Sequence, residues 1–574
     1  MLDIIADGLS VLYTYKEAVI VFFITTFGIG FFSTSIIVDR EVDVNIRIMA
    51  SFGVGSILLC LVSFVFIVLS HFFGFLLQFG SYATLLFAVI ILLKGFWSGE
   101  FQKAYTINTL TVGIALFFLL LVRLAFLKHI ILPSYSDSPI HYQIVYGFLH
   151  PEVGNASKLS LPTIFDNYYH YGFHSLATWL TSITGFEAVQ MISLIGQLLL
   201  VTAPLSILCF VYALTYNRNG ALFAGLLAAV GWLMPAFSIN WGKFPALAAM
   251  AVMPVVALVP LLFLDNRIKW AKVIFYGLLL WVGNTFIHTR IIICLVLVFA
   301  SFFVIKKLQF KGGFGFFQSV RFTLLVLISL WPVSDLVIDF YNKMPILIML
   351  LILMPFAFQS YPAVSTGIFV FLSGLSLVTL IPNLLSIGGQ ALLDRQFLAM
   401  TLYMPLSIMG GLGFGGLVKK LDAHLVWKWI VVGVFVVGIV AHIAPESFFP
   451  DRCCNYFKEN DRFAFHWIQN KSSSQSLYFI STFRDDNDRA YGTDAGIWIS
   501  PLTMIATNRL PFNTKWNSTD VLNEICSFGI KDAYIYMGGR EFSFDNNQLS
   551  HLIWVSPVFR SGEVVVYKIS GCTQ

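Results

Sequence analysis

The sequence predicts an α-helical membrane protein that crosses the bilayer about fourteen times and ends in a small α/β domain. Three observations lead to this fold class. Hydrophobic residues make up 58% of the 574 residues, charged residues only 11%, and the mean hydropathy of +0.81 is too apolar for a water-soluble globule. Long apolar runs recur throughout the first three quarters of the chain. From about Pro445 the composition becomes that of an ordinary globular domain.

A helix needs about twenty apolar residues to cross a hydrocarbon core of roughly 30 Å. The short segments around His288 and Lys343 leave open whether neighbouring candidates are separate, merged or re-entrant. The candidate spans are residues 17–38, 48–70, 76–95, 107–127, 187–214, 219–238, 244–265, 272–287, 289–305, 322–339, 344–358, 363–382, 397–417 and 427–444. No basic segment or cleavage site precedes the first span, so we expect it to be retained.

Basic residues predict the orientation of these spans, because short cytoplasmic loops are enriched in lysine and arginine. If the spans alternate, groups such as Lys306–Lys307 and Lys419–Lys420 fall on one side, which we assign to the cytoplasm. The loop 132–186, the turn 241–244 and the loop 383–395 then face outward. The small net charge of +5 gives no indication of nucleic-acid binding.

Two domains are therefore expected, a transmembrane domain over residues 1–444 and an extracytoplasmic α/β domain over residues 445–574. The second contains an amphipathic helical pattern at 457–471 and strand-like runs at 476–481, 533–539 and 563–569. It also contains Cys453, Cys454, Cys526 and Cys572, an even number that permits disulfides in an oxidising compartment. We do not expect the adjacent Cys453 and Cys454 to pair with each other, and without a Cys-x-x-Cys spacing a metal site is not favoured.

The external loop 132–186 is the longest polar interruption among the spans, and Asp137 lies in its segment SYSDSPIHYQIVYGFL. One interpretation is that Asp137 caps the short helix that Pro139 and the following apolar residues predict. The other is that its carboxylate acts as a general base at the membrane surface. The second half of the loop, DNYYHYGFHSLATWLTSITG, places His170 and His174 on one face of a helix.

These segments resemble the C superfamily of glycosyltransferases (GT-C), multi-pass enzymes with an essential acid in the first large external loop. Further pieces agree in order: NWGKFPALAAMAVMP at 240–254, FIHTR at 286–290 and LLDRQFLAMTLYMPLSIMGGLG at 392–413, followed by the exported domain. The resemblance spans most of the chain, although each motif is short. It is closest to a poorly characterised prokaryotic branch of polyprenyl-phosphate-sugar-dependent enzymes.

The resemblance implies that a sugar moves, with inversion, from a polyprenyl-phosphate donor to a glycan, lipid or protein acceptor at the outer face of the cell membrane. It implies no metal and no cofactor beyond this lipid-linked donor, and membrane lipids as partners. The reaction needs a base for the acceptor hydroxyl, cations for the phosphate and a groove for the lipid. By position in the motif, Asp137 is the base.

Candidate substrate-binding residues lie at the predicted outer boundaries of the spans. Lys243, Arg290 and Arg395 are placed to meet a lipid phosphate, with Arg395 and Arg290 the stronger candidates. Each cation has a structural alternative, because lysine and arginine near span ends often reach to lipid headgroups. The candidate histidines, for which a structural role is as good an explanation, are His141, His170, His174 and His288.

The loop departs from the family pattern, because many members carry paired acids where this chain has serine on both sides of Asp137. Asp166 is the preferred partner carboxylate and Glu152 the weaker one. If Asp166 is the partner, the two aspartates could exchange the role of base. In the exported domain, the acidic stretch 485–494 lacks the spacing of an EF-hand and fits a solvated turn better, and Trp498 is a candidate for holding a glycan.

Two other functions compete. A lipid or glycan transporter or flippase is also polytopic, but it predicts charges in mid-span, of which Arg123 is the main example. A zinc hydrolase could use His141, His170 and His174, although the His-x-x-x-His spacing lacks the intervening glutamate.

Overall fold

The computed structural model describes residues 2–37, 43–101, 107–150, 169–264, 267–308, 313–380, 386–387, 390–391, 393–443, 445–484, 490–530 and 532–570. The chain forms two compact units. The first comprises Met1–Ala125, Gly147–Ser238 and Phe244–Phe449. The second comprises Pro450–Gln574 together with Phe126–Tyr146 and Ile239–Lys243, two short segments that come from between the helices of the first unit.

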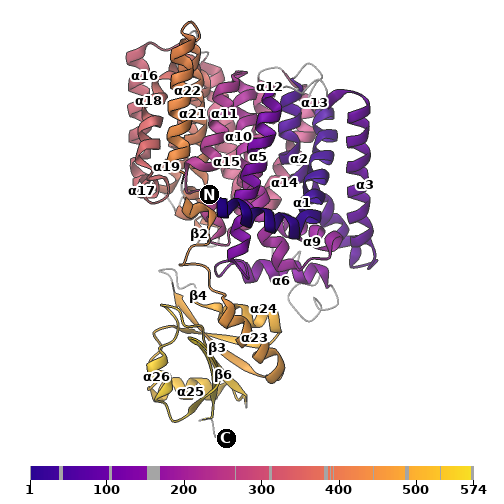
Figure 1. Cartoon of the computed structure of the whole chain (residues 1–574), viewed down its shortest axis with the longest axis vertical. Coiled ribbons are helices and arrows are strands. Elements are labelled where there is room, and N and C mark those ends of the chain that lie inside the picture. Colours follow the sequence, from indigo (N-terminus) through magenta and orange to yellow (C-terminus); the bar gives the residue numbers. More distant parts are fainter. Residues whose placement is uncertain are drawn as a thin grey trace. The chain divides into compact units, whose positions relative to one another are not determined.

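The first unit is a bundle of long apolar helices that run side by side (Figure 1). Within the described residues, ten helical segments are long and apolar enough to cross a membrane, which makes the chain a multi-pass membrane protein. They are built from α1 (Leu2–Ile37), α2 (Val44–Ser70), α3 (Leu76–Trp97), α5 (Ile107–Ala125), α10 (Ala188–Thr215), α12 (Phe244–Leu264), α13 to α14 (Trp270–Ile287), α16 to α17 (Phe316–Tyr341), α19 (Pro362–Leu380) and α20 to α21 (Arg395–Lys420).

The other four predicted spans are helical but shorter or irregular. They correspond to α11 (Arg218–Leu226) with the π-helix η2 (Leu227–Gly231), α15 (Ile291–Leu308), α18 (Met344–Ser360) and α22 (Leu425–Ala441). The helix that begins at Arg218 changes to π-helix geometry and ends at Trp232, whose backbone is extended. The predicted count of about fourteen is higher than ten because window hydropathy registers neither the break after α11 nor the shortness of α18 and α22, which have 17 residues each.

The loop 132–186 contains two helices, α6 (Ser138–Leu149) and α9 (Gly172–Thr184). The α9 helix is buried from Gly172 to Leu180, so this half of the predicted surface loop is part of the packed interior of the first unit. Glu152 and Asp166 lie outside the described residues. Of the two short segments that join the second unit, the first begins with the 3₁₀ turn η1 (Phe126–His129), and the second begins at the last residue of the 3₁₀ turn η3 (Ala236–Ile239).

Arg123 in α5 is buried, and both terminal nitrogens of its guanidinium group donate to main-chain oxygens. Nη1 donates to Ser447 O at 3.0 Å, Nη2 donates to Ala229 O at 2.7 Å, and the group lies 5.0 Å from the ring centre of Phe448. Ser447 and Phe448 belong to η6 (Pro445–Phe448). Arg123 therefore connects α5 to the C-terminal end of the first unit. This is a structural role for the main mid-span charge that favoured a transporter.

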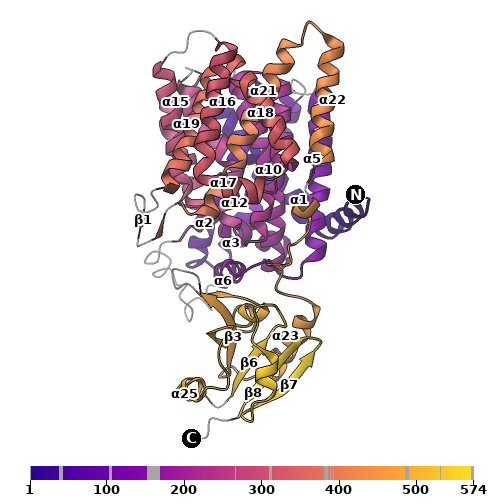
Figure 2. The same cartoon turned by 90° about the vertical axis from the view of Figure 1, so that its left-hand side faces the viewer.

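The second unit is built on a six-stranded mixed sheet in the order β4–β3–β6–β8–β7, with β5 also paired to β3 (Figure 2). Its strands are β3 (Leu477–Arg484), β4 (Ala490–Gly492), β5 (Ala506–Pro511), β6 (Ala533–Met537), β7 (Val555–Ser561) and β8 (Val564–Ile569). Parallel pairing of β3 with β5 and β6 contrasts with the antiparallel pairing of β8 with β6 and β7. The predicted α/β domain is confirmed.

Apolar side chains of the central strands and the helix α25 (Thr519–Ser527) form the core of this unit, among them Phe479, Trp516, Ile525, Ile535 and Tyr567. The predicted amphipathic helix is α23 (Glu459–Lys471), which packs on β7 and β8. Smaller elements are η7 (Ala495–Trp498), α24 (Ile499–Thr503) and α26 (Asn546–Ser550); in the first unit a two-stranded ladder joins β1 (Ser386–Ile387) and β2 (Gln390–Ala391).

One prediction about the cysteines is wrong. Cys453 and Cys454 are joined by a disulfide, with the 3.8 Å Cα–Cα distance of adjacent residues. The chain turns tightly here, since the amides of Cys454 and Asn455 both donate to Asp451 O at 3.2 Å, and this turn brings neighbouring side chains together. Cys526 is also disulfide-bonded, and Cys572 lies outside the described residues. Cys60, Cys209 and Cys294 are free and buried.

Candidate functional site

Asp137 and Lys243 form an ion pair within the second unit. Lys243 Nζ lies 2.6 Å from Asp137 Oδ2, and the two side chains are 27% and 25% exposed. Asp137 ends the turn before α6, and its main-chain oxygen accepts the first helical hydrogen bonds, from the amides of Ile140 and His141. Its backbone therefore occupies the helix-capping position that the sequence suggested, while its carboxylate binds a cation and remains partly open to solvent.

The turn that carries Lys243 is shaped to lie close to the start of α6. Gly242 has a φ of +63°, a left-handed conformation that other residues adopt only at a cost. A Cβ atom at this position would lie 2.7 Å from Ser138 Oγ and 3.0 Å from Ser134 O, so a side chain would push the two segments apart. Glycine at 242 is thus required both for the turn and for the approach of Lys243 to Asp137.

The side chain of His141 in α6 is hydrogen-bonded to this turn. The imidazole is buried, and its Nε2 lies 2.9 Å from Gly242 O, the carbonyl directly before Lys243. Burial is the largest cause that lowers the pKa of His141 to about 4, although the nearby Asp137 opposes this shift. The ring is therefore neutral at pH 7, and a neutral ring bonded to a carbonyl must carry its proton on Nε2. His141 was predicted to bind substrate, and in this arrangement it positions the Lys243 turn.

The first unit brings together a second group of predicted residues. The rings of His170 and His288 lie 4.4 Å apart between centroids, Tyr169 stacks on His170, and His288 stacks on Phe397. Two residues after His288, Arg290 forms an ion pair with Asp394. His174 lies four residues after His170 and is fully buried in α9, 5.6 Å from the ring of Tyr169. The prediction that His170 and His174 share one face of a helix is wrong, because α9 begins at Gly172 and His170 precedes it.

Asp394 has two tasks, since its Oδ1 also accepts the amide of Phe397 at 2.8 Å and thereby caps α20. Arg395 is more exposed and forms an ion pair with Asp335 of α17 (Ser334–Tyr341). The sequence interpretation named Arg290 and Arg395 but missed Asp335 as a partner. Asp335 and Asp339 are the two acids of an otherwise apolar stretch, and acids within a predicted span were the available signal.

No group of three histidine, cysteine, aspartate or glutamate side chains suitable for a metal occurs within the described ranges. Residues 485–489 of the acidic stretch lie outside them. Asp494, which follows, is buried and accepts the amides of Gly496 and Gly538 and the hydroxyl of Ser543, each at 2.9 Å. Its oxygens are therefore occupied by protein donors.

Trp498 does not present a surface for a sugar. The indole is only 1% exposed and lies 6.0 Å from the ring of Tyr142 in α6. The two residues instead connect α6 to the C-terminal part of the same unit. The suggestion that Trp498 holds a glycan is wrong because stacking on a sugar requires an accessible ring face.

A family model described as a family of unknown function (DUF6541) matches residues 48–331. No curated protein matches the chain. Among solved structures, that of the arabinofuranosyltransferase AftD from Mycobacteria is similar, with 13% sequence identity and a TM-score of 0.37. The similarity covers 80% of this chain but only 40% of that one, so the chain spans less than half the length of AftD. Similarity at this level supports no conclusion about activity.

Proposed function

We propose that the chain is a membrane glycosyltransferase that moves a sugar from a polyprenyl-phosphate donor to an acceptor hydroxyl, with Asp137 as the general base. The observation that carries the proposal is the Asp137–Lys243 ion pair, a carboxylate and an ammonium 2.6 Å apart and both partly exposed. These are the two charged groups that such a transfer needs next to each other, one for a proton and one for a phosphate.

The ion pair also suggests how the two roles are coupled. A lipid phosphate carries negative charge and competes with Asp137 for the Lys243 ammonium. A carboxylate that loses a neighbouring cation becomes a stronger base. Arrival of the donor would therefore release Asp137 to act on the acceptor, and Asp137 would remain neutralised while the site is empty.

The transfer is a single displacement at the anomeric carbon. The acceptor oxygen forms a bond to this carbon as the bond to the phosphate oxygen breaks, and the electron pair leaves with the phosphate. The hydroxyl proton passes to Asp137, and Lys243 stabilises the charge on the departing phosphate. Attack opposite to the leaving group inverts the configuration. We propose that His141 positions Lys243. The further substrate-binding residues that we propose are Arg290, Arg395, His170, His174, His288 and Asp166.

The test is incubation of purified full-length protein with a panel of polyprenyl-phosphate sugars, followed by chromatography for released polyprenyl phosphate and for glycosylated acceptor. We expect consumption of at least one donor by the wild-type protein and none by Asp137→Asn. Asp422→Asn is the matched control, because Asp422 also pairs with a lysine, Lys428, but at an exposed position in the first unit. Equal turnover by all three proteins would overturn the proposal.

The same panel separates transfer from transport. With the protein in liposomes and the labelled donor added on one side, a flippase moves the intact donor across the bilayer without breaking its sugar–phosphate bond. Movement without bond cleavage would exclude the proposed reaction. The main-chain partners of Arg123 give a structural role to the mid-span charge that the transport alternative relied on.

A further inference from the structure

The disulfide-bonded Cys453 and Cys454 lie in a turn that is bonded to the second unit's two inserted segments. Cys453 is exposed, whereas Cys454 is buried with 2% of its surface accessible. Residues 450–456, which we call the disulfide turn, are far in sequence from both segments. They nevertheless donate to or accept from each of them.

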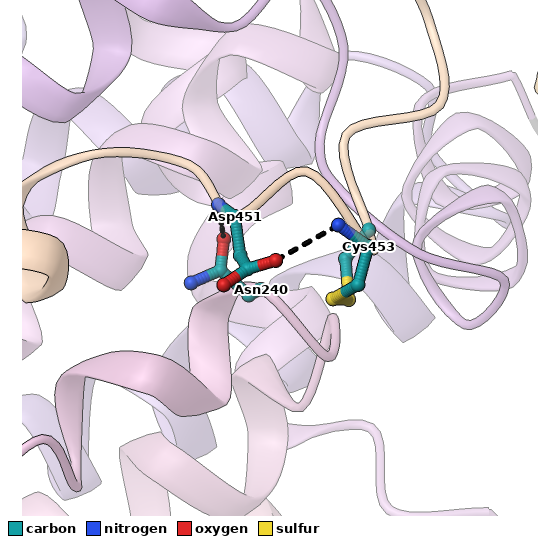
Figure 3. The surroundings of a disulfide bond; sticks show 4 residues. Asn240, Asp451 and Cys453 are labelled. Carbon is teal, nitrogen blue, oxygen red and sulfur yellow. Dashed lines mark hydrogen bonds between the residues drawn. A yellow bond between two sulfur atoms is a disulfide. The ribbon is translucent and has the colours of Figure 1, made fainter.

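On one side, the disulfide turn is bonded to the segment that carries Lys243. The amide of Asp451 donates to Asn240 Oδ1 at 2.9 Å, and Asp451 Oδ1 accepts the amide of Cys453 at 2.8 Å (Figure 3). Asn240 is 1% exposed and lies three residues before Lys243. A relay of two hydrogen bonds thus connects the disulfide to the start of the Lys243 turn.

On the other side, the disulfide turn is bonded to the segment that carries Asp137. The amide of Tyr135 donates to Cys454 O at 2.9 Å, and the Tyr135 ring lies 6.0 Å from that of Tyr456. Tyr135 has a φ of +66°, which is unusual for a residue with a side chain and persists only where surrounding contacts fix it. It lies two residues before Asp137.

We propose that the Cys453–Cys454 disulfide is a positioning element that holds Asp137 and Lys243 at the spacing of their ion pair. A bond between adjacent side chains closes a small ring and restricts the backbone of both residues. Cys453 N, which donates to Asp451 Oδ1, and the Cys454 carbonyl, which accepts from the Tyr135 amide, are attached directly to the two Cα atoms of this ring. Fixing the ring therefore fixes the two attachment points at once. The catalytic meaning of this arrangement rests on the proposed function; the mechanical linkage does not.

The first test measures hydrogen–deuterium exchange of full-length protein in nanodiscs, comparing wild type with the double variant Cys453→Ser, Cys454→Ser. We expect the amides of Tyr135 and of 239–243 to exchange at least tenfold faster in the variant, and those of β3 to be unchanged. The matched control is Cys526→Ser, which removes the other disulfide from α25. Unchanged exchange at Tyr135 and 239–243 in the double variant would overturn the proposal.

The second test uses wild-type protein, so it applies even if the double variant fails to fold. Dithiothreitol reaches the disulfide of folded wild-type protein through the exposed Cys453, reduces it to two thiols and is itself oxidised to a cyclic disulfide. Exchange at Tyr135 should accelerate on reduction and recover after reoxidation. With the active donor, kcat should fall at least tenfold while KM changes less than threefold, and reoxidation should restore it. If exchange accelerates on reduction but the protein is active on no donor, the proposed function is disproved and the mechanical linkage is supported. If exchange accelerates while kcat stays at the wild-type value, the disulfide has no role in positioning the ion pair.

Discussion

Two ion pairs of similar kind are built differently in the two units. Lys243 and Asp137 are 106 residues apart in sequence, and Arg290 and Asp394 are 104 residues apart. Asp394 divides its oxygens between Arg290 and the amide of Phe397, so the pair also caps the start of α20. The surroundings of Asp137 serve the pair itself, through the left-handed Gly242, the buried His141 and the disulfide turn.

The difference shows that an ion pair between residues far apart in sequence does not by itself indicate a reaction centre. Partly exposed pairs contribute little to stability, on the order of 0–1 kcal/mol. A structure that uses a left-handed glycine turn and a buried imidazole to hold such a pair gains little folding free energy from it. These surroundings are better explained if the pair has a chemical task.

The largest expected effect is that of Asp137→Asn. Loss of a general base should lower transfer by on the order of 10²–10⁴-fold, measured as turnover of the active donor, with little change in unfolding temperature. Asp394→Ala should do the reverse, losing about 1 kcal/mol of stability with the helix cap and retaining transfer within tenfold. If Asp394→Ala abolishes transfer and Asp137→Asn does not, the two pairs have been assigned the wrong way round.

The next effect concerns Lys243. Removing a charged hydrogen-bond partner of a phosphate costs about 1.5–3 kcal/mol, so Lys243→Ala should weaken donor binding by roughly 10–100-fold, measured by a binding titration with the donor. Lys243→Arg preserves the charge and should recover part of the affinity. Full donor affinity in Lys243→Ala would assign the phosphate to Arg290 or Arg395, the cations that the sequence favoured.

A comparison of Gly242→Ala with Gly529→Ala should separate two costs of adding a side chain, that of the positive φ and that of crowding around the new Cβ atom. Gly242 and Gly529 both have a φ near +60°, but a Cβ atom at Gly529 meets nothing within 4 Å, whereas at Gly242 it meets Ser138 and Ser134. Gly529→Ala should therefore lose only the conformational term of about 1 kcal/mol. Gly242→Ala should lose more, on the order of 2–3 kcal/mol in total, and should also reduce donor turnover. Equal losses in thermal unfolding would mean that the turn is not crowded.

The pH dependence of the free energy of unfolding should reveal the lowered pKa of His141. Its pKa is lowered from 6.5 to about 4 in the folded protein, so the unfolded chain binds the proton first as pH falls. The free energy of unfolding should then decrease by about 2 kcal/mol between pH 7 and pH 5 through this residue. Burial raises the pKa of Asp461 to about 6, which has the opposite effect over this range. The difference between wild type and His141→Gln isolates the imidazole, and parallel stability curves would contradict the assignment.

Much of the fold could be predicted because it follows from hydrophobicity that is local in sequence. The apolar runs became helices, and the strand-like runs after Leu477 became the sheet. Asp137 and Lys243 were both named from local motifs. Their pairing could not be predicted, because it depends on the positive φ of Gly242 and on contacts that join residues more than a hundred positions apart. The bond between Cys453 and Cys454 likewise depends on a turn whose geometry the sequence does not reveal.

The smallest expected effect is that of Arg395→Ala. Arg395 and its partner Asp335 are both more than half exposed, so the side chain is well solvated and its pair contributes little to stability. A solvated cation adds less to phosphate binding than a partly buried one, because water screens it. We therefore expect Arg395→Ala to raise the donor KM only about two- to fivefold. This rise should be smaller at higher salt concentration. Asp335→Asn is the matched variant: it frees Arg395 without removing it, and should leave donor KM equal to or below that of wild type. A loss as large as that of Lys243→Ala would place the donor phosphate at Arg395 and shift the reaction centre toward the first unit.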